Sequence, residues 1–181
     1  MGLVVSRQEA VEWRRTLRQE GKCFVFTSGC FDLLQRGHVE YLAAARALGD
    51  ALLVGVNDDA SVRRFKGPGR PLIEAADRAA VLAALAAVDR VVLFPEDTPA
   101  ELVGALVPDV LAKGGDYALD AIVGREAVEA AGGRVVRIPF RAGHSTSALL
   151  ERLRAGGREP VSKPAAEPGD ARDARDARGR A

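Results

Sequence analysis

The sequence predicts an α/β fold built around a central parallel sheet of five strands. Short apolar segments alternate with amphipathic segments of about 10–15 residues, the order typical of strand–helix–strand units. The apolar segments are continuous rather than alternating with polar residues, as expected for strands that are covered on both faces. The chain has 181 residues, a length that favours one compact domain.

Helices are predicted where apolar residues recur at helical spacing between capping residues. The first helix follows Ser6, which has the spacing of a capping box with Glu9, and it stops at Gly21. The predicted helices cover residues 7–20, 39–50, 75–87, 101–107, 121–131 and 145–154. The segment between the second strand and Pro71 is predicted to be a polar loop.

Strands are predicted at short runs rich in β-branched and aromatic residues. These runs cover residues 22–27, 51–57, 90–94, 109–113 and 134–140. In parallel sheets, ligands bind beyond the carboxyl ends of the strands. A ligand site is therefore expected in the loops that follow Thr27, Asn57, Phe94, Lys113 and Phe140.

The composition separates a folded domain at residues 1–154 from a low-complexity tail at 155–181. The tail has three prolines and no aromatic residue, so we predict that it is disordered. A formal net charge of +1 disfavours a nucleic-acid partner. No segment has the length and hydropathy of a signal peptide or membrane span, so a cytoplasmic protein is expected. Two cysteines and two histidines disfavour a disulfide framework or a zinc site.

Four of the expected loops contain groups suited to phosphate. Gly37 and His38 open a helix whose N-terminal N–H groups attract anions. The other three loops are 63–71, with four cations and two glycines, 113–117, with two glycines, and 143–147, with three hydroxyls at a helix start. Neither GxGxxG nor GxxxxGK[ST] is present.

Each loop also has a purely structural alternative. His38 and Ser145 can serve as helix caps, the cations can form a solvated surface, and the glycine pair can be an ordinary turn. Cys30 and His38 could act as a nucleophile and its base, but a cysteine is more often a small buried apolar residue, which is the favoured interpretation.

The order of these motifs resembles the cytidylyltransferase-like nucleotidyltransferases. The blocks that carry the resemblance, over about residues 5–154, are GCFDLLQRGH, KGPGRP, ADRAAVLAAL, FPEDTP, PDVLAKGGDY and STS. Within that family they are most similar to the D-glycero-D-manno-heptose 1-phosphate adenylyltransferases. The resemblance implies a Rossmann-like α/β sandwich of the HIGH-type nucleotidyltransferases, with any sugar kinase on a separate protein.

The resemblance also implies a set of site residues. The implied catalytic residues are His38 and Lys66. The implied nucleotide-binding residues are Gly29, Cys30, Phe31, Gln35, Gly37, His38, Lys66, Arg78, Gly114, Asp116, Ser145 and Thr146. The implied sugar-phosphate-binding residues are Arg70, Lys113, Gly115 and Tyr117. Gln35 stands where the family's HxGH motif has its first histidine, and a neutral amide can donate a hydrogen bond but carries no charge.

The implied reaction transfers AMP from ATP to heptose 1-phosphate, releasing pyrophosphate and giving a precursor of lipopolysaccharide. Mg²⁺ would be held mainly by the ATP phosphates and water, and no separate protein metal site is expected. Asp32 or Asp116 could contact the ion, and Asp32 could equally serve in structural bonding within its turn. A homodimer is left open. Two alternatives remain: another enzyme of this family, such as a glycerol-3-phosphate cytidylyltransferase, and a nucleotide-binding protein that has lost activity through Gln35.

Overall fold

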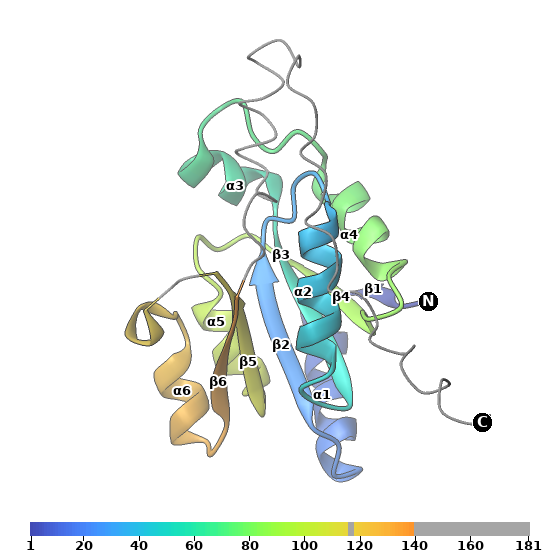
Figure 1. The fold of residues 1–181 in the computed structure, drawn as a ribbon, viewed down its shortest axis with the longest axis vertical. Coiled ribbons are helices and arrows are strands. Elements are labelled where there is room, and N and C mark those ends of the chain that lie inside the picture. The colour runs from blue at the N-terminus through green and yellow to red at the C-terminus, as the bar shows by residue number, and fades with distance from the viewer. Residues whose placement is uncertain (116–117, 140–181) are drawn as a thin grey trace, which may run out of the picture.

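The computed structural model of the protein describes residues 1–115 and 118–139. The strands are β1 (Leu3–Val5), β2 (Phe24–Gly29), β3 (Ala51–Asn57), β4 (Arg90–Phe94), β5 (Val110–Gly114) and β6 (Arg134–Ile138). The helices are α1 (Arg7–Gln19), α2 (Arg36–Arg46), α3 (Asp59–Lys66), α4 (Ala75–Ala83), α5 (Ala100–Leu106) and α6 (Arg125–Ala130), with a short 3-10 helix η1 (Leu119–Ala121). All neighbouring strands run parallel, in the spatial order β1-β4-β3-β2-β5-β6 (Figure 1). The predicted α/β fold with a central parallel sheet is confirmed.

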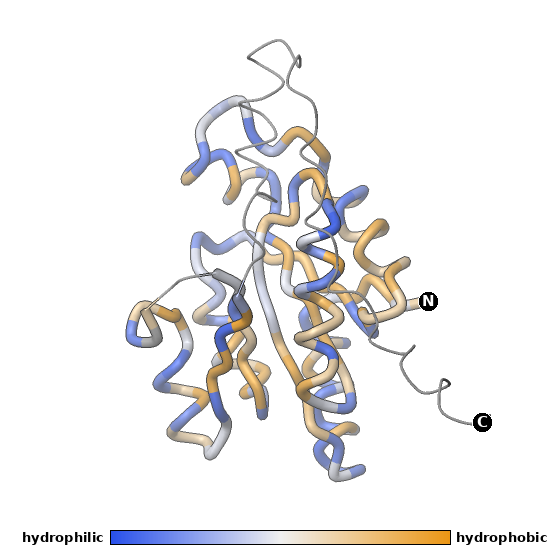
Figure 2. The backbone as a smooth tube through the Cα atoms, viewed as in Figure 1, coloured by the Kyte–Doolittle hydropathy of each residue, from blue (hydrophilic) through white to orange (hydrophobic). Residues whose placement is uncertain are grey.

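Helices cover the sheet on both faces, and β2 shows how its residues alternate between them. Phe24 and Phe26 belong to a buried cluster with α1, α5 and α6, whereas Val25 between them belongs to a second cluster with α2 and α4. Figure 2 shows hydrophobic residues along the central strands and hydrophilic residues on the outer helices. Two-sided burial explains why the strand sequences are apolar without interruption.

The sheet has six strands, so the predicted count of five was wrong. The missed strand is β1, which pairs with β4 at the sheet's edge. It has three residues, and the side chains of Leu3 and Val4 are more than half exposed, so it lacks the long buried run by which a central strand is recognised. The predicted polar loop before Pro71 was also wrong in part, because α3 forms there between the cap residues Asp58 and Gly67.

Several predictions lie outside the described residues. These are the end of the last strand, the helix at 145–154 and the tail at 155–181. Within the described part of the chain, no helix is long and apolar enough to cross a membrane.

Three aspartates close the sheet at the end where its strands begin, which we call the amino edge. Asp50, Asp89 and Asp109 directly precede β3, β4 and β5. Each accepts a backbone N–H at 2.8 Å from an adjacent segment; the donors are Cys23, Leu52 and Phe24, respectively. Arg14, with a side chain only 5% exposed, pairs with Asp109 at 2.7 Å. These bonds satisfy one exposed and two partly buried backbone donors at this edge.

At the opposite end, which we call the carboxyl edge, the strand order creates a crevice. The chain proceeds from β2 outward through β3 and β4 on one side, and then continues through β5 and β6 on the other. The connections from neighbouring strands β2 and β5 therefore leave in opposite directions. Such a switch point is where open parallel sheets bind ligands.

Candidate functional site

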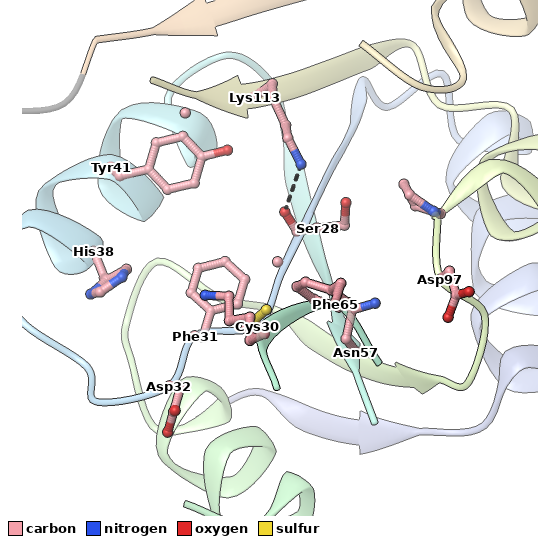
Figure 3. Close-up of a pocket in the computed structure, with 14 residues that line it drawn as sticks. Ser28, Cys30, Phe31, Asp32, His38, Tyr41, Asn57, Phe65, Asp97 and Lys113 are labelled. Carbon is pink, nitrogen blue, oxygen red and sulfur yellow. Dashed lines mark hydrogen bonds between the residues drawn. The ribbon is translucent and has the colours of Figure 1, made fainter. Parts of the chain in front are cut away.

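A cavity of about 370 Å³ occupies this switch point, and we call it the main cavity (Figure 3). Its walls come from the carboxyl ends of β2, β3 and β5, the first turn of α2, the last turn of α3 and the segment after β4. The lining residues are Ser28, Gly29, Cys30, Phe31, Asp32, His38, Tyr41, Asn57, Phe65, Lys66, Asp97, Pro99, Lys113 and Gly114. The cavity therefore joins segments that are far apart in the sequence.

His38 lies in the first turn of α2, where the helix presents unpaired N–H groups. Its Nδ1 accepts the backbone N–H of Gln35 at 3.0 Å, so in the neutral ring the proton is on Nε2. Burial lowers the pKa of His38, and the nearby charge of Lys66 lowers it further. His38 is therefore a neutral Nε2–H donor at neutral pH, in an environment that favours anions.

Gln35 is the N-cap residue of α2. Its side-chain Nε2 is buried and has no hydrogen-bond partner in the described part of the chain. An unpaired buried donor costs free energy, so the position favours a bound acceptor over the empty state. This amide is the group that replaces the histidine of the HxGH motif.

The loop between β2 and α2 is held in an unusual backbone conformation. Phe31 and Leu33 both adopt positive φ angles, of 49° and 58°, which L residues rarely do. A Cβ atom at Gly29 would lie 3.3 Å from the Phe31 ring, so this glycine gives the ring its space. The ring in turn contacts His38 edge-on, with centroids 5.9 Å apart. Strain of this kind is concentrated at functional sites.

Two lysines line the cavity, one from α3 and one from β5. Lys66 ends α3, where Gly67 leaves the helix with φ of 92°. Lys113 is the penultimate residue of β5, and its Nζ donates to the carbonyl oxygen of Ser28 at 3.4 Å. Burial lowers the pKa of Lys113, so the free site holds this charge at a cost that an anionic ligand would offset. Burial also raises the pKa of the Cys30 thiol, which argues against a thiolate nucleophile.

Asp32 holds a loop and has little capacity left for a metal ion. Its carboxylate accepts hydrogen bonds from Arg70 Nε at 2.7 Å and from the backbone N–H groups of Leu72 and Ile73. These bonds lower its pKa against the opposing effect of burial, which is the largest single influence. The described residues contain no group of three or more His, Cys, Asp or Glu that could hold a metal.

Arg78 connects four segments around the cavity and is almost fully buried. Its guanidinium donates to the carbonyls of Ile73, Cys30 and Asn57 and to the carboxylate of Asp59. These bonds use four of its five N–H donors, so Arg78 positions the loops that surround the cavity. A direct contact with the nucleotide, as the resemblance implied, stays a prediction.

The structure brings together many, but not all, of the predicted site residues. Those that line the cavity are Gly29, Cys30, Phe31, His38, Lys66, Lys113 and Gly114. Gln35, Gly37, Arg70, Arg78 and Gly115 lie in adjoining segments and are not among the lining residues. Asp116, Tyr117, Ser145 and Thr146 lie outside the described residues. The functional roles of all these residues stay predictions.

Six lining residues were not predicted from the sequence; they are Ser28, Tyr41, Asn57, Phe65, Asp97 and Pro99. Tyr41 lines the cavity, Thr27 is its hydrogen-bond partner at 2.5 Å, and burial raises its pKa to about 12. Its spacing of three from His38 on one helix face was a usable signal. Asn57, Phe65 and Asp97 had no such signal, because nothing in the sequence distinguishes them from strand-end, helix and loop residues that do not line a cavity.

A cation-lined cavity at the switch point of a parallel sheet defines a nucleotide-binding α/β protein. The chain matches the cytidylyltransferase-like family over residues 26–152 and belongs to it. The prediction of a nucleotidyltransferase is confirmed at the level of this family.

Curated relatives agree with that assignment. The chain is 60% identical over 133 residues to the bifunctional protein HldE of Citrifermentans bemidjiense, covering 74% of this chain and 27% of that protein. For the bifunctional protein HldE of Alkalilimnicola ehrlichii the identity is 55% over 150 residues, covering 83% and 31%. The chain thus spans less than a third of the length of these relatives.

Two solved structures are also similar. The lipopolysaccharide core biosynthesis protein of Thermoplasma volcanium is 30% identical, with a TM-score of 0.55, covering 67% of this chain and 98% of that one. The pantoate-beta-alanine ligase of Francisella tularensis has a TM-score of 0.56 at 11% identity, covering 80% and 69%, and shows likeness of fold alone.

Proposed function

We propose that the protein transfers AMP from ATP to D-glycero-D-manno-heptose 1-phosphate. The observation that carries the proposal is the meeting of His38, Lys66 and Lys113 around one cavity at the switch point. The acceptor is proposed from the resemblance of the KGPGRP and KGGDY blocks. The 30% identity to a lipopolysaccharide core biosynthesis protein is consistent with a sugar phosphate acceptor.

In this reaction a phosphate oxygen of the acceptor attacks the α-phosphorus of ATP. The bond between the α-phosphorus and the oxygen that bridges to the β-phosphorus breaks, and pyrophosphate leaves with the electron pair. The attacking phosphate is already ionised, so the enzyme needs no nucleophile of its own. It must align two anions and stabilise charge that grows on the phosphate oxygens.

The described residues can meet these requirements. Lys66 and Lys113 supply positive charge from two walls of the cavity, which reduces repulsion between the two substrates. His38 Nε2–H and the first turn of α2 are donors that are held in place before the substrate arrives. Preorganised donors of this kind lower the barrier because they need no reorientation during the reaction.

Mg²⁺ would enter as part of the ATP substrate, held by phosphate oxygens and water. Asp32 is committed to Arg70 and two backbone donors, so we assign it no metal contact. The protein's contribution toward the ion is then indirect, through the groups that hold the phosphates.

The test is pyrophosphate release with a matrix of ATP, CTP, heptose 1-phosphate, other sugar phosphates and glycerol 3-phosphate. We expect ATP with heptose 1-phosphate to give the highest kcat/KM. Faster turnover with CTP and glycerol 3-phosphate would contradict the proposal. Product release without an acceptor would indicate simple hydrolysis instead.

A matched pair of variants links this activity to the cavity. Lys66 and Arg63 both lie in the last turn of α3, but only Lys66 lines the cavity. Lys66→Ala should lower kcat/KM by about 10- to 100-fold, the value of a lost charge-assisted hydrogen bond. Arg63→Ala should leave it nearly unchanged. Equal effects of the two substitutions would place the phosphates elsewhere.

A further inference from the structure

A second, smaller cavity adjoins the main cavity, and we call it the side cavity. Its volume is about 190 Å³, about half that of the main cavity. Ser28, Asp97, Pro99 and Lys113 line both, so the two cavities meet at these residues. Thr98 and Val123 are among the residues that line only the side cavity.

The two cavities differ in the groups that they offer to phosphate. Lys66 and the neutral Nε2–H donor of His38 line the main cavity but not the side cavity. Asp97 stands on the other side of Ser28 from His38 (Figure 3). Its Oδ1 accepts a hydrogen bond from Arg64 at 2.6 Å, which restrains the carboxylate. A polyphosphate is therefore favoured beside Lys66 and His38, away from the Asp97 carboxylate at the junction of the two cavities.

The chemical groups of the side cavity suit a neutral, hydroxyl-bearing molecule. The Thr98 hydroxyl and the Asp97 carboxylate can hydrogen-bond to sugar hydroxyls, whereas Pro99 and Val123 offer apolar surface to the carbon face of a ring. The small volume fits a single sugar better than a nucleoside with its phosphates.

Lys113 stands where the two cavities meet, which is where the reaction needs a cation. The acceptor phosphate must approach the α-phosphorus of ATP, so both anions converge at one point. A buried lysine that lines both spaces can contact each of them. The nucleotide phosphates would then occupy the His38 side, and the remainder of the acceptor would extend past Lys113.

We propose that the side cavity binds the sugar portion of the acceptor, with Thr98 and Asp97 reading its hydroxyl groups. This inference rests on the proposed function, because it assigns a place to the second substrate of that reaction. It also gives Lys113 and Arg70 different roles. Lys113 can contact the acceptor phosphate, whereas Arg70 is held by Asp32 and lines neither cavity.

The test compares acceptor KM with ATP affinity in the full chain. Val123 is 41% exposed, so Val123→Phe can add bulk to the side cavity without filling the buried core. We expect the acceptor KM to rise by on the order of tenfold or more, as for other overpacked sites. The dissociation constant of ATP, measured by titration without acceptor, should stay within about twofold because none of its proposed contacts changes.

Two controls match the substitutions. Val81→Phe places the same ring on α4, at a valine that is 50% exposed and lines neither cavity, and should change neither constant. Thr98→Val keeps the shape of the side chain and removes its hydroxyl, so the acceptor KM should rise by roughly fivefold, the value of one hydrogen bond. Thr16→Val makes the same change on exposed α1 and should have no effect.

The outcomes separate the two proposals. If heptose 1-phosphate turns over poorly but another phosphate is a good acceptor whose KM the variants raise, the proposed function fails and the side cavity assignment stands. If heptose 1-phosphate is the best acceptor and the variants change nothing, the assignment fails. A weakened ATP affinity with unchanged acceptor KM would indicate that the nucleotide binds in the side cavity and would overturn the assignment. A wild-type protein without activity on any acceptor would overturn both.

Discussion

The two edges of one sheet differ in how their polar groups are satisfied. At the amino edge, Asp50, Asp89 and Asp109 each accept a backbone N–H, and Arg14 completes the network around Asp109. At the carboxyl edge, three buried side-chain atoms have no partner among the described residues. They are Gln35 Nε2, Arg70 Nη2 and Glu96 Oε2, which follow β2, β3 and β4.

The difference indicates which edge stabilises the fold and which binds ligand. Unpaired buried polar groups cost free energy, so a protein without a ligand at that edge would gain stability by losing them. The three unpaired atoms all lie at the edge that contains the cavity, as expected for a site whose polar groups gain hydrogen-bond partners when the substrates bind. Substitutions at the amino edge should therefore change stability, and those at the carboxyl edge should change turnover.

The largest effect is expected for His38. His38→Ala should lower kcat by about 10²- to 10³-fold, as when a single preorganised donor is removed. Steady-state kinetics would measure this, with the melting temperature as a check on folding. His38→Asn keeps an acceptor near the position of Nδ1 for the Gln35 N–H but lacks the Nε2 donor, so it should be as impaired as alanine. A folded, fully active His38→Ala would reduce His38 to a helix cap.

The amino edge should show the reverse pattern. Asp109→Ala leaves Arg14 buried without its partner and removes the acceptor of the Phe24 N–H, so the free energy of unfolding should fall by about 2–3 kcal/mol. Denaturant unfolding would measure it, while kcat/KM at 25 °C should stay the same. Glu129→Ala breaks an exposed pair with Arg125 and should cost about 0.5 kcal/mol or less. A large loss of activity in folded Asp109→Ala would contradict the claim that the amino edge contributes to stability and not to turnover.

The lowered pKa of Lys113 predicts that kcat/KM depends on pH. Burial lowers its pKa, so in the free enzyme the charge is present below that pKa and is lost as pH rises through it. The alkaline limb of kcat/KM should therefore fall at a lower pH than an exposed lysine would give. Lys113→Arg, which keeps its charge throughout, should remove the limb even if it lowers the maximum. A limb that remains in this variant must come from another group.

The smallest effect is expected for Gln35. Gln35→Ala removes a neutral donor and should lower kcat by less than about tenfold, well below the effect of His38→Ala. Gln35→His restores the HxGH motif and should hold or raise activity, with a new dependence between about pH 5 and 8. Profiles of kcat against pH for both variants would show this. If Gln35→Ala were as damaging as His38→Ala, the amide would be an equal partner in catalysis.

Sequence patterns predicted the sheet well where a strand is a continuous, mostly apolar run. The strands at 51–57 and 90–94 agree with the structure to the residue; every residue of β3 is buried, and three of the five residues of β4 are. The three-residue edge strand β1 has no such run. Helix α3 was missed because half of its eight residues are Asp, Arg or Lys, a composition shared with solvated loops.

The site was predictable in location but not in its internal connections. Loop positions after parallel strands fix which segments meet, so the convergence near His38, Lys66 and Lys113 could be expected. The bonds of Arg78 could not, because its partner Cys30 is 48 residues away and the contact depends on the final packing. The side cavity, likewise, exists only once η1 and the segment after β4 lie together.

The pairing of β1 with β4 also constrains the order of events during synthesis. Val4 pairs with Val91, so β1 emerges from the ribosome with no partner until 87 further residues have been made. At roughly 5–20 residues per second, that wait lasts roughly 4–17 s. During this interval Leu3 and Val4 form an unpaired apolar segment on the nascent chain. A strand of three residues presents few backbone groups to a wrong partner, so its brevity limits aggregation before the sheet is complete.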